Sequence, residues 1–299
     1  MSSRFVAGMT VDEVLRAAEA IQQQGIASTL DSLGENVTTP QEAQRSADIY
    51  HRLLDAIQSR RLNANVSVKL TQMGMDLDTH HEQARSIVSD LVDHAVAANT
   101  FVRVDMEGCE YTQATIDLVR ALHAKPANRG HVGIVIQAYL YRSAADIAAL
   151  TQEGIRIRLC KGAYKEPPDL AYPQKSHVDG NFVKLTRQLL DTAGNANNDA
   201  ASVANNGSVT GIYHGIATHD DAMVEAAKSY VKEKNIDRHS FEFQMLYGVR
   251  RDLQRALVAE GYNVRVYVPF GAEWYPYFMR RLAERPANVL FLAKNMLKS

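Results

Sequence analysis

The stretch VGIVIQAYLYRSAADIAALTQEGIRIRLC, residues 132–160, indicates how the chain folds. It opens with the apolar, β-branched run 132–139 and closes with a second such run, 155–160. Runs of this length and composition are typical of buried strands. The segment 143–152 between them is typical of a helix. A strand, a helix and a second strand in succession predict two parallel strands joined by a right-handed crossover.

The same alternation continues along the chain. The predicted strands are 26–33, 66–70, 101–107, 132–139, 155–160, 209–218, 240–246 and 264–270. The predicted helices are 40–60, 80–99, 111–125, 143–152, 181–192, 220–234 and 247–260. Eight strands alternating with helices favour a closed (β/α)8 barrel over an open doubly wound sheet. No GxGxxG motif follows the first strand, which further weakens a dinucleotide-binding sheet.

The segments outside this repeat also carry local signals. Thr10 and Glu13 form a capping box and Gly25 ends the segment, which predicts a helical extension over residues 1–25. The whole chain, residues 1–299, is predicted to be a single catalytic barrel domain. The segment 191–211 is rich in Asn, Ala and Gly, which predicts a mobile surface loop before the sixth strand.

Composition excludes several classes of protein. The 299 residues are 46% hydrophobic and 22% charged, and the formal net charge of -1 provides no basic field for nucleic acid. Two cysteines, Cys109 and Cys160, form no disulfide framework, which fits a reducing compartment. No apolar run approaches 18 residues, and the N-terminus lacks the apolar core of a signal peptide. We therefore expect a cytoplasmic protein without a transmembrane segment, and leave peripheral membrane contact open.

Polar side chains gather where the predicted strands end. Active sites of (β/α)8 barrels lie at the carboxyl ends of the strands. Seven of the eight predicted strands offer polar residues there: Lys69; Asp105 and Glu107; Gln137 and Tyr139; Arg158, Lys161 and Tyr164; Thr218 and His219; Glu242 and Gln244; and Tyr267. Each has a structural alternative; a buried Lys69–Asp105 ion pair is one example. Together they predict a polar ligand site, because polar groups in an apolar interior cost several kcal/mol unless they are satisfied.

The predicted site is cationic, and one late segment adds to its charge. In WYPYFMRRLAERPAN, residues 274–288, Tyr277, Arg281 and Glu284 would share one helix face beside Arg280. This pattern suits an anion clamp, although a solvated surface helix would show it too. With Lys69, Arg158 and Lys161, the two arginines predict an anionic ligand such as a carboxylate, a phosphate or a reduced flavin.

Several catalytic classes lack their motifs. No HxH, HExxH or CxxC spacing is present, so no metal site is predicted. No GxSxG elbow is present either. The chemistry is therefore expected to come from an organic cofactor or from a Schiff-base lysine.

Nine ordered motifs resemble those of the proline dehydrogenase family. They are STLDSLGE (28–35), SVKL (67–70), VDMEG (104–108), IQAY (136–139), RLCKGAY (158–164), ATHD (217–220), EFQMLYG (242–248), VYVPFG (266–271) and YFMRRLAE (277–284). The resemblance runs from about residue 28 to the C-terminus. It implies a distorted (β/α)8 barrel with a last helix over the carboxyl ends of the strands, FAD as cofactor and L-proline as substrate.

The resemblance also implies roles for single residues. Its catalytic set is Lys69, Asp105, Arg158 and Tyr267. The proline carboxylate would be bound by Lys69, Arg280 and Arg281, and the ring would contact Tyr267, Tyr277 and Leu246, with Tyr164 in the same pocket. Asp105 would hold its neighbours in place through Lys69. The residues implied around FAD are Arg158 near flavin N5, Gln137 at the ring edge, Cys160, Lys161, Gly162, Ala163, Thr218, His219, Gln244 and Glu284.

Two positions depart from the family pattern. Lys165 stands where some members carry a Trp that stacks on the cofactor, which removes support for adenine stacking. Cys160 stands where Val is usual, a tolerated small apolar change.

The implied reaction is the oxidation of L-proline to Δ1-pyrroline-5-carboxylate, the first step of proline catabolism. Electrons would pass to a quinone-type acceptor, and a pyrroline-5-carboxylate dehydrogenase could receive the product. The N-terminal helix looks complete, which favours a monofunctional enzyme. Three alternatives stay open: a hydroxyproline dehydrogenase, opposed by the steric bulk of Tyr277; a Schiff-base aldolase using Lys69; and a non-catalytic ligand-binding barrel.

Overall fold

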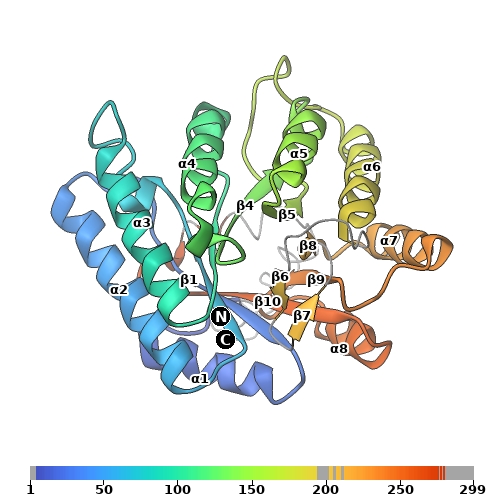
Figure 1. The fold of residues 1–299 in the computed structure, drawn as a ribbon, viewed down its shortest axis with the longest axis horizontal. Helices are drawn as coiled ribbons and strands as arrows, with labels where there is room; N and C mark the ends of the chain where they lie inside the picture. The colour runs from blue at the N-terminus through green and yellow to red at the C-terminus, as the bar shows by residue number, and fades with distance from the viewer. Residues whose placement is uncertain are drawn as a thin grey trace, which may run out of the picture.

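The structure, a computed structural model, is a closed barrel of eight parallel strands in the order β1-β10-β9-β8-β5-β4-β3-β2 (Figure 1). It describes residues 5–193, 202–204, 207–209, 212–275, 277 and 279. The barrel strands are β1 (Ala27–Ser32), β2 (Ala64–Val68), β3 (Val102–Val104), β4 (Val132–Gln137), β5 (Arg156–Cys160), β8 (His214–Ala217), β9 (Phe241–Leu246) and β10 (Asn263–Phe270). The predicted (β/α)8 barrel is confirmed.

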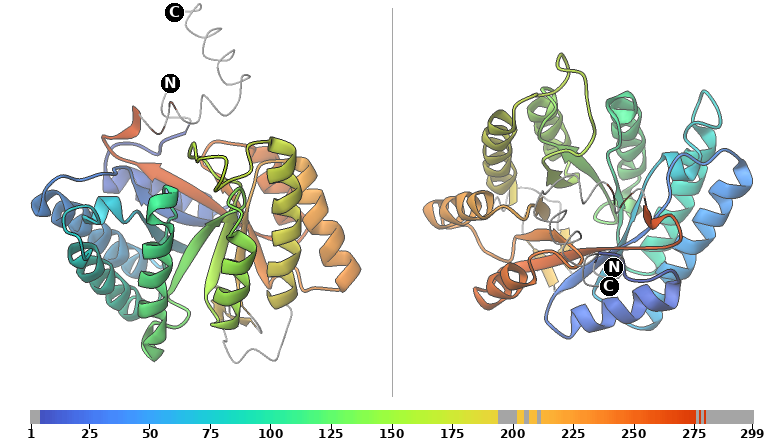
Figure 2. Two further views of the ribbon diagram at one scale, coloured as in Figure 1. Left: turned by 90° about the horizontal axis from the view of Figure 1, so that it is seen from above. Right: turned by 180° about the vertical axis from the view of Figure 1, so that it is seen from behind.

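The helices lie outside the strands and cover the barrel wall (Figures 1 and 2). They are α2 (Pro40–Ser59), α3 (Glu82–Ala97), α4 (Thr112–Ala124), α5 (Ser143–Gln152), α6 (Lys175–Ala193), α7 (Asp221–Lys234) and α8 (Arg251–Ala259), with short 3-10 turns η2 (Thr71–Met73), η3 (Cys109–Tyr111) and η4 (Pro126–Asn128). Because the helices pack on one side of each strand and the barrel interior on the other, strands β1 to β4 are buried along their whole length.

An additional helix, α1 (Val11–Gln22), packs against β1, β10 and α2. It covers the wall where the first and last strands of the barrel meet. The predicted capping box is confirmed: the Thr10 hydroxyl accepts from the Glu13 N–H, and the Glu13 carboxylate accepts from the Thr10 N–H. That residues 1–299 form one catalytic domain stays a prediction.

Four predicted boundaries are wrong by more than two residues. The strand expected over 209–218 begins only at His214, as β8. Strand β3 ends at Val104, so Asp105 and Glu107 lie on the chain that leaves the barrel. Helix α6 begins at Lys175, six residues before the expected start, because its first turns are polar and its buried residues begin only at Phe182. Helix α8 begins at Arg251 because Arg250, with a φ of 49°, turns the chain before the helix.

The segment 191–211 is more regular than predicted. Residues 191–193 complete α6, and β6 (Ser202–Ala204) pairs with β7 (Gly207–Val209) as an antiparallel pair. Two short runs around the sequence Ala-Asn-Asn-Gly are typical of a hairpin. The rest of the segment lies outside the described residues.

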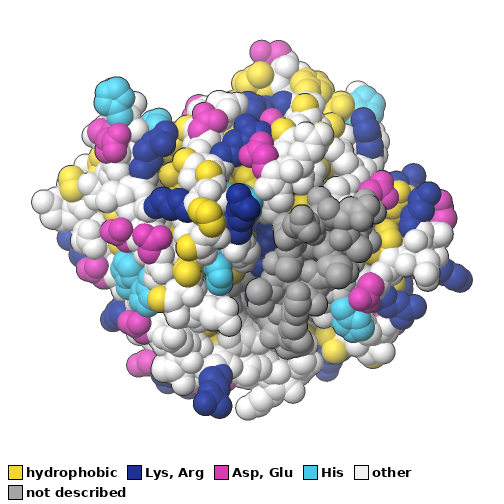
Figure 3. All heavy atoms as spheres, viewed as in Figure 1, with side chains coloured by type: hydrophobic (Ala, Val, Ile, Leu, Met, Phe, Trp, Pro, Cys, Tyr) yellow, Lys and Arg dark blue, Asp and Glu magenta, His cyan; other side chains and the backbone are white. Residues whose placement is uncertain are grey.

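The molecular surface carries charges of both signs (Figure 3). On the face drawn in Figure 3, basic and acidic side chains are interspersed rather than separated by sign. Within the described ranges, no helix is long and apolar enough to cross a membrane. Of the segment 274–288, which is predicted to hold the last helix, Trp274, Tyr275, Tyr277 and Met279 are described, and all four are helical.

Candidate active site

Asp105 is the centre of the polar cluster at the mouth of the barrel. Its carboxylate accepts hydrogen bonds from Ser67 Oγ at 2.6 Å, Arg158 Nη1 at 2.9 Å and the Tyr267 hydroxyl at 3.0 Å. Lys69 Nζ lies 3.8 Å from the same carboxylate. The structure therefore brings together the four residues of the predicted catalytic set, although they come from four different strands or strand ends.

Lys69 has a second and closer partner, Asp31 of β1. The ammonium lies 3.2 and 3.3 Å from the two Asp31 oxygens, and both side chains are buried. Burial alone would lower the pKa of Lys69, but the carboxylates of Asp31, Asp105 and Glu107 raise it above its ordinary value. Lys69 is therefore held as an ammonium. It does form a buried ion pair, the structural role considered for it from the sequence, but its main partner is Asp31 and not Asp105.

Asp31 is absent from the predicted site. Its carboxylate also accepts a hydrogen bond from the Tyr50 hydroxyl, 3.3 Å away, which reaches the barrel from α2. A carboxylate inside the buried first strand was the signal available in the sequence, because such a group needs a cationic or hydrogen-bonding partner.

Arg158 is held on two sides by the barrel. Its Nε donates to Gln244 Oε1 at 2.5 Å, and its Nη1 donates to Asp105 and to Ser67 Oγ. The remaining nitrogen, Nη2, is buried and has no hydrogen-bond partner among the residues described. A buried guanidinium N–H is costly to leave unsatisfied, so this position favours an additional acceptor group at the barrel mouth.

The prediction of an excess of positive charge is wrong for the described part of the site. Lys69 faces Asp31, and Arg158 faces Asp105. Lys161 Nζ lies 2.5 Å from Asp179 and 2.9 Å from Asp220. The cations are thus individually neutralised by carboxylates on other elements, which a list of strand-end residues does not reveal.

The residues after β8 take part in local structure. Thr218 Oγ1 accepts from the backbone N–H of Asp220, which caps α7, and His219 Nε2 accepts from the Leu246 N–H at 2.8 Å. This contact assigns the neutral His219 ring as the Nδ1–H tautomer. Both residues therefore lie at the barrel mouth, just before the start of α7. Their hydrogen bonds give each of them a structural role there.

The segment after β5 passes close to the end of β4. Gly162 has a φ of 118°, and a Cβ there would come within 2.6 Å of the Tyr139 ring, so the site needs a glycine. Gln137 Nε2 donates to the Glu107 carbonyl at 2.9 Å. Ala163 is exposed and Cys160 is partly buried. Burial and the Glu107 carboxylate raise the pKa of Tyr164, so its phenol stays protonated.

The residues predicted around the substrate ring are only partly described. Leu246 and Tyr267 are paired neighbours on β9 and β10. Tyr277 is buried against Val6 and Leu33, beside Trp274. Arg280, Arg281 and Glu284 lie outside the described residues, so the proposed anion clamp remains a prediction.

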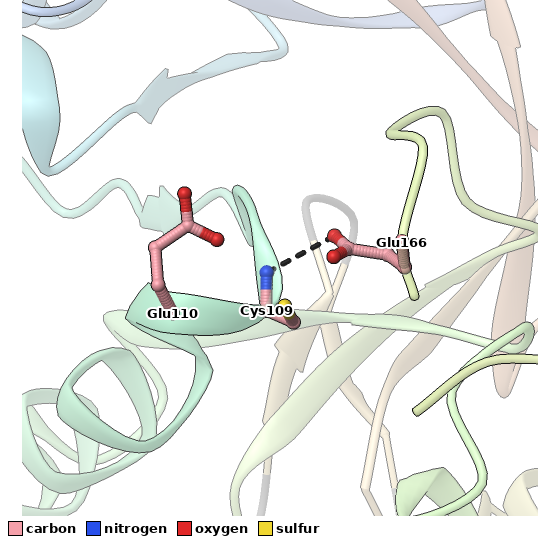
Figure 4. A group of neighbouring side chains, drawn as sticks. All are labelled: Cys109, Glu110 and Glu166. Atoms are coloured by element: carbon pink, nitrogen blue, oxygen red, sulfur yellow. Dashed lines mark hydrogen bonds between the residues drawn. The ribbon is translucent and has the colours of Figure 1, made fainter. Parts of the chain in front are cut away.

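One group of potential metal ligands occurs within the described ranges: Cys109, Glu110 and Glu166 (Figure 4). Glu166 Oε1 already accepts from the Cys109 N–H and the Tyr139 hydroxyl, each at 3.0 Å. Hydrogen bonding to Glu166, with burial, raises the pKa of the Cys109 thiol to about 11, whereas a metal ligand must be a thiolate. We interpret this group as a contact between η3 and the segment that follows β5, and we assign it no metal.

Comparisons with known proteins relate the chain to one enzyme family. The family model described as "Proline dehydrogenase" matches residues 14–294. The chain is 39% identical to "Proline dehydrogenase" of Deinococcus radiodurans, an alignment covering 100% of this chain and 90% of that protein. It is 38% identical to "Proline dehydrogenase 2" of Bacillus subtilis, covering 99% of this chain and 90% of that protein.

A solved structure shows the same architecture. Proline utilization A from Bdellovibrio bacteriovorus, inactivated by N-propargylglycine, superposes with a TM-score of 0.82 at 25% identity. The match covers 94% of this chain but 32% of that protein, so the chain spans about a third of its length. From the family match and the two full-length relatives, the chain belongs to the proline dehydrogenase family.

Proposed function

We propose that the protein oxidises L-proline to Δ1-pyrroline-5-carboxylate with FAD as its cofactor. The observation that carries the proposal is the Asp105 cluster, which collects Lys69, Arg158 and Tyr267 at the mouth of a barrel that matches the family over residues 14–294. Relatives named for this activity align with the whole chain, which supports the choice of substrate.

The residues at the barrel mouth fit a flavin. The buried Arg158 Nη2 offers a hydrogen-bond donor that none of the described residues uses. FAD, when bound, would supply the acceptor for the hydride that leaves C5 of proline. Residues proposed to hold it are Arg158, Gln137, Cys160, Lys161, Gly162, Ala163, Thr218, His219 and Glu284.

Lys69 is suited to bind the substrate carboxylate. An ammonium has three N–H donors, and Asp31 on one side leaves donor capacity for an anionic ligand. We place Arg280 and Arg281 on the other sides of that carboxylate, and Tyr267, Leu246, Tyr277 and Tyr164 around the ring. Such a clamp would fix the ring so that C5 faces the hydride acceptor.

The charge pairing bears on the substrate amine. Hydride can leave C5 readily only when the amine is neutral, and unpaired carboxylates nearby would keep it protonated. Asp31 and Asp105 are each tied to a cation, so neither adds an uncompensated negative charge. The balanced site is therefore compatible with loss of the amine proton before oxidation.

The Schiff-base aldolase is disfavoured by Lys69 itself. A nucleophilic lysine must lose its proton, which is usually achieved by a lowered pKa. Here the surrounding carboxylates raise the pKa of Lys69 instead. A quinone-type electron acceptor, transfer of the product to a pyrroline-5-carboxylate dehydrogenase, and a cytoplasmic location belong to the proposal.

Anaerobic titration with L-proline is the deciding experiment. The purified protein should be yellow, and stoichiometric proline should bleach the flavin absorbance. A parallel titration with trans-4-hydroxy-L-proline should require a higher concentration. A colourless protein that cannot be reconstituted with FAD, or a yellow protein that proline does not bleach, would overturn the assignment.

A further inference from the structure

We propose that Gln244 and Glu242 of β9 form a relay that positions the Arg158 guanidinium, and that Gly215 of β8 provides the space for this relay. The inference rests on the proposed function only in assigning Arg158 to the flavin. It gives Gln244 a different role from the cofactor contact expected from the sequence, since Gln244 would act through Arg158.

The amide orientation of Gln244 is set by opposite charges on its two sides. Its Oε1 accepts from Arg158 Nε at 2.5 Å, while its Nε2 donates to Glu242 Oε1 at 2.6 Å. A reversed amide would place N–H groups against the guanidinium and an oxygen against the carboxylate. Because all three side chains are buried, water cannot relieve that mismatch.

Glu242 is itself fixed from behind. Arg265 Nε donates to its Oε1 at 2.7 Å, and the Tyr213 hydroxyl donates to its Oε2 at 3.1 Å. Burial alone would raise the pKa of Glu242, but the Arg265 guanidinium holds it below its ordinary value. The carboxylate is therefore ionised, and its charge dictates which end of the Gln244 amide faces Arg158.

Gly215 lies between the two ends of the relay. In the strand register it pairs with Arg158 of β5 on one side and with Glu242 of β9 on the other. A Cβ at this position would come within 2.3 Å of Gln244 Nε2. Because Gly215 has no side chain, the Gln244 amide can occupy this space and reach Arg158.

The relay extends the Asp105 cluster across the barrel. Charges alternate from Arg265 to Glu242, through the neutral Gln244 to Arg158, and on to Asp105. Two fixed contacts, at Nε and Nη1, leave the guanidinium plane little freedom to rotate. The direction of Nη2, the donor offered to the flavin, is thus set by residues that we do not expect to touch it.

The test compares four variants of the FAD-loaded protein with a fifth, control variant. Gln244→Met keeps the length of the side chain but removes both hydrogen bonds. Glu242→Gln removes the charge that orients the amide, and Gln244→Glu places two carboxylates together. The double variant E242Q/Q244E exchanges the two groups and restores a donor-to-acceptor chain. Thr29→Val is the control, because it removes a buried 2.6 Å hydrogen bond to Asn65 elsewhere in the barrel.

We expect Q244M to retain flavin and to bind proline within twofold of the wild type. Its limiting rate of flavin reduction should fall at least tenfold. If the reduced flavin is bound tenfold more weakly relative to the oxidised form, the two-electron potential shifts by about 30 mV to more negative values. E242Q should act in the same direction, the double variant should recover most of the loss, and T29V should leave rate and potential unchanged.

Two results would overturn the relay: Q244M with the rate and potential of the wild type, or a double variant whose losses are the sum of the single ones. If Q244M fails to retain flavin, its crystal structure decides, since an unchanged Arg158 rotamer contradicts the relay and a changed one supports it. Failure of the proposed function is a separate result: proline would then not bleach the flavin absorbance of the wild-type protein.

Discussion

The buried pair Asp31–Lys69 gives a sharp prediction, because Asp31→Asn removes one charge from it at almost constant volume. The Asp31 side chain is 1% exposed, and both of its oxygens face Lys69 Nζ at 3.2 and 3.3 Å. Breaking a buried pair costs 3–5 kcal/mol. We expect Asp31→Asn to lower the free energy of unfolding by about 3 kcal/mol, the lower end of this range, because Asp105 at 3.8 Å still compensates part of the Lys69 charge.

Urea unfolding at pH 7 measures this loss directly, and the melting temperature should fall by roughly 6 °C. Asp55→Asn is the matched control. Asp55 pairs with His94 at 3.0 Å, but its side chain is 70% exposed, so its loss should cost less than about 0.5 kcal/mol. Lys69→Met should lower the free energy of unfolding less in the D31N background, as the double variant D31N/K69M, than it does in the wild type. A D31N loss below about 1 kcal/mol, or additive losses in the double variant, would refute the reasoning.

Three further predictions concern the substrate and pH. Arg281→Met should raise the KM for proline sharply while FAD stays bound, as measured by steady-state kinetics and flavin absorbance; unchanged proline kinetics would remove Arg281 from the carboxylate clamp. Tyr277→Ser should narrow the preference for proline over 4-hydroxyproline, and an unchanged ratio of kcat/KM values would argue against ring contact. Burial lowers the pKa of His214 from an ordinary 6.5 to about 3, so the unfolded chain binds the extra proton first and stability is lost as pH falls below 6.5. The loss due to His214 should reach about 2 kcal/mol at pH 5, and a His214→Leu variant should show a flatter urea-unfolding profile between pH 7 and pH 5; equal slopes would contradict this assignment.

The sequence was sufficient for the barrel because its evidence is local and repeated. Apolar strand-length runs alternate with helical segments, and the chain has few other ways to bury eight such strands. The least accurate boundaries lie where local pattern and tertiary packing disagree. Helix α6 starts within a polar segment, and β3 stops at Val104 although the apolar pattern continues to Met106.

The candidate site could be located from sequence, but its pairing could not. The rule that active sites lie at strand ends selects Lys69, Asp105, Arg158 and Tyr267 as neighbours. It does not say which carboxylate serves which cation, because partners come from strands far apart in the chain. Asp31 is 38 residues from Lys69, and Gln244 is 86 residues from Arg158. For this reason the predicted excess of positive charge is wrong for Lys69, Arg158 and Lys161, the three cations of the site that the structure describes.

The balanced charges change how the site would recognise an anion. A net positive pocket would attract carboxylates from a distance, but its cations would repel one another and resist fixed positions. In this barrel Asp31 and Asp105 hold Lys69 and Arg158 in place, so attraction depends on the direction of individual N–H donors. Donors that are fixed before the ligand arrives need no reorganisation during the reaction. Neutralising Asp105 should therefore disturb the position of Arg158 more than it strengthens binding of the proline carboxylate. Steady-state kinetics of Asp105→Asn should accordingly show a larger fall in kcat than in KM.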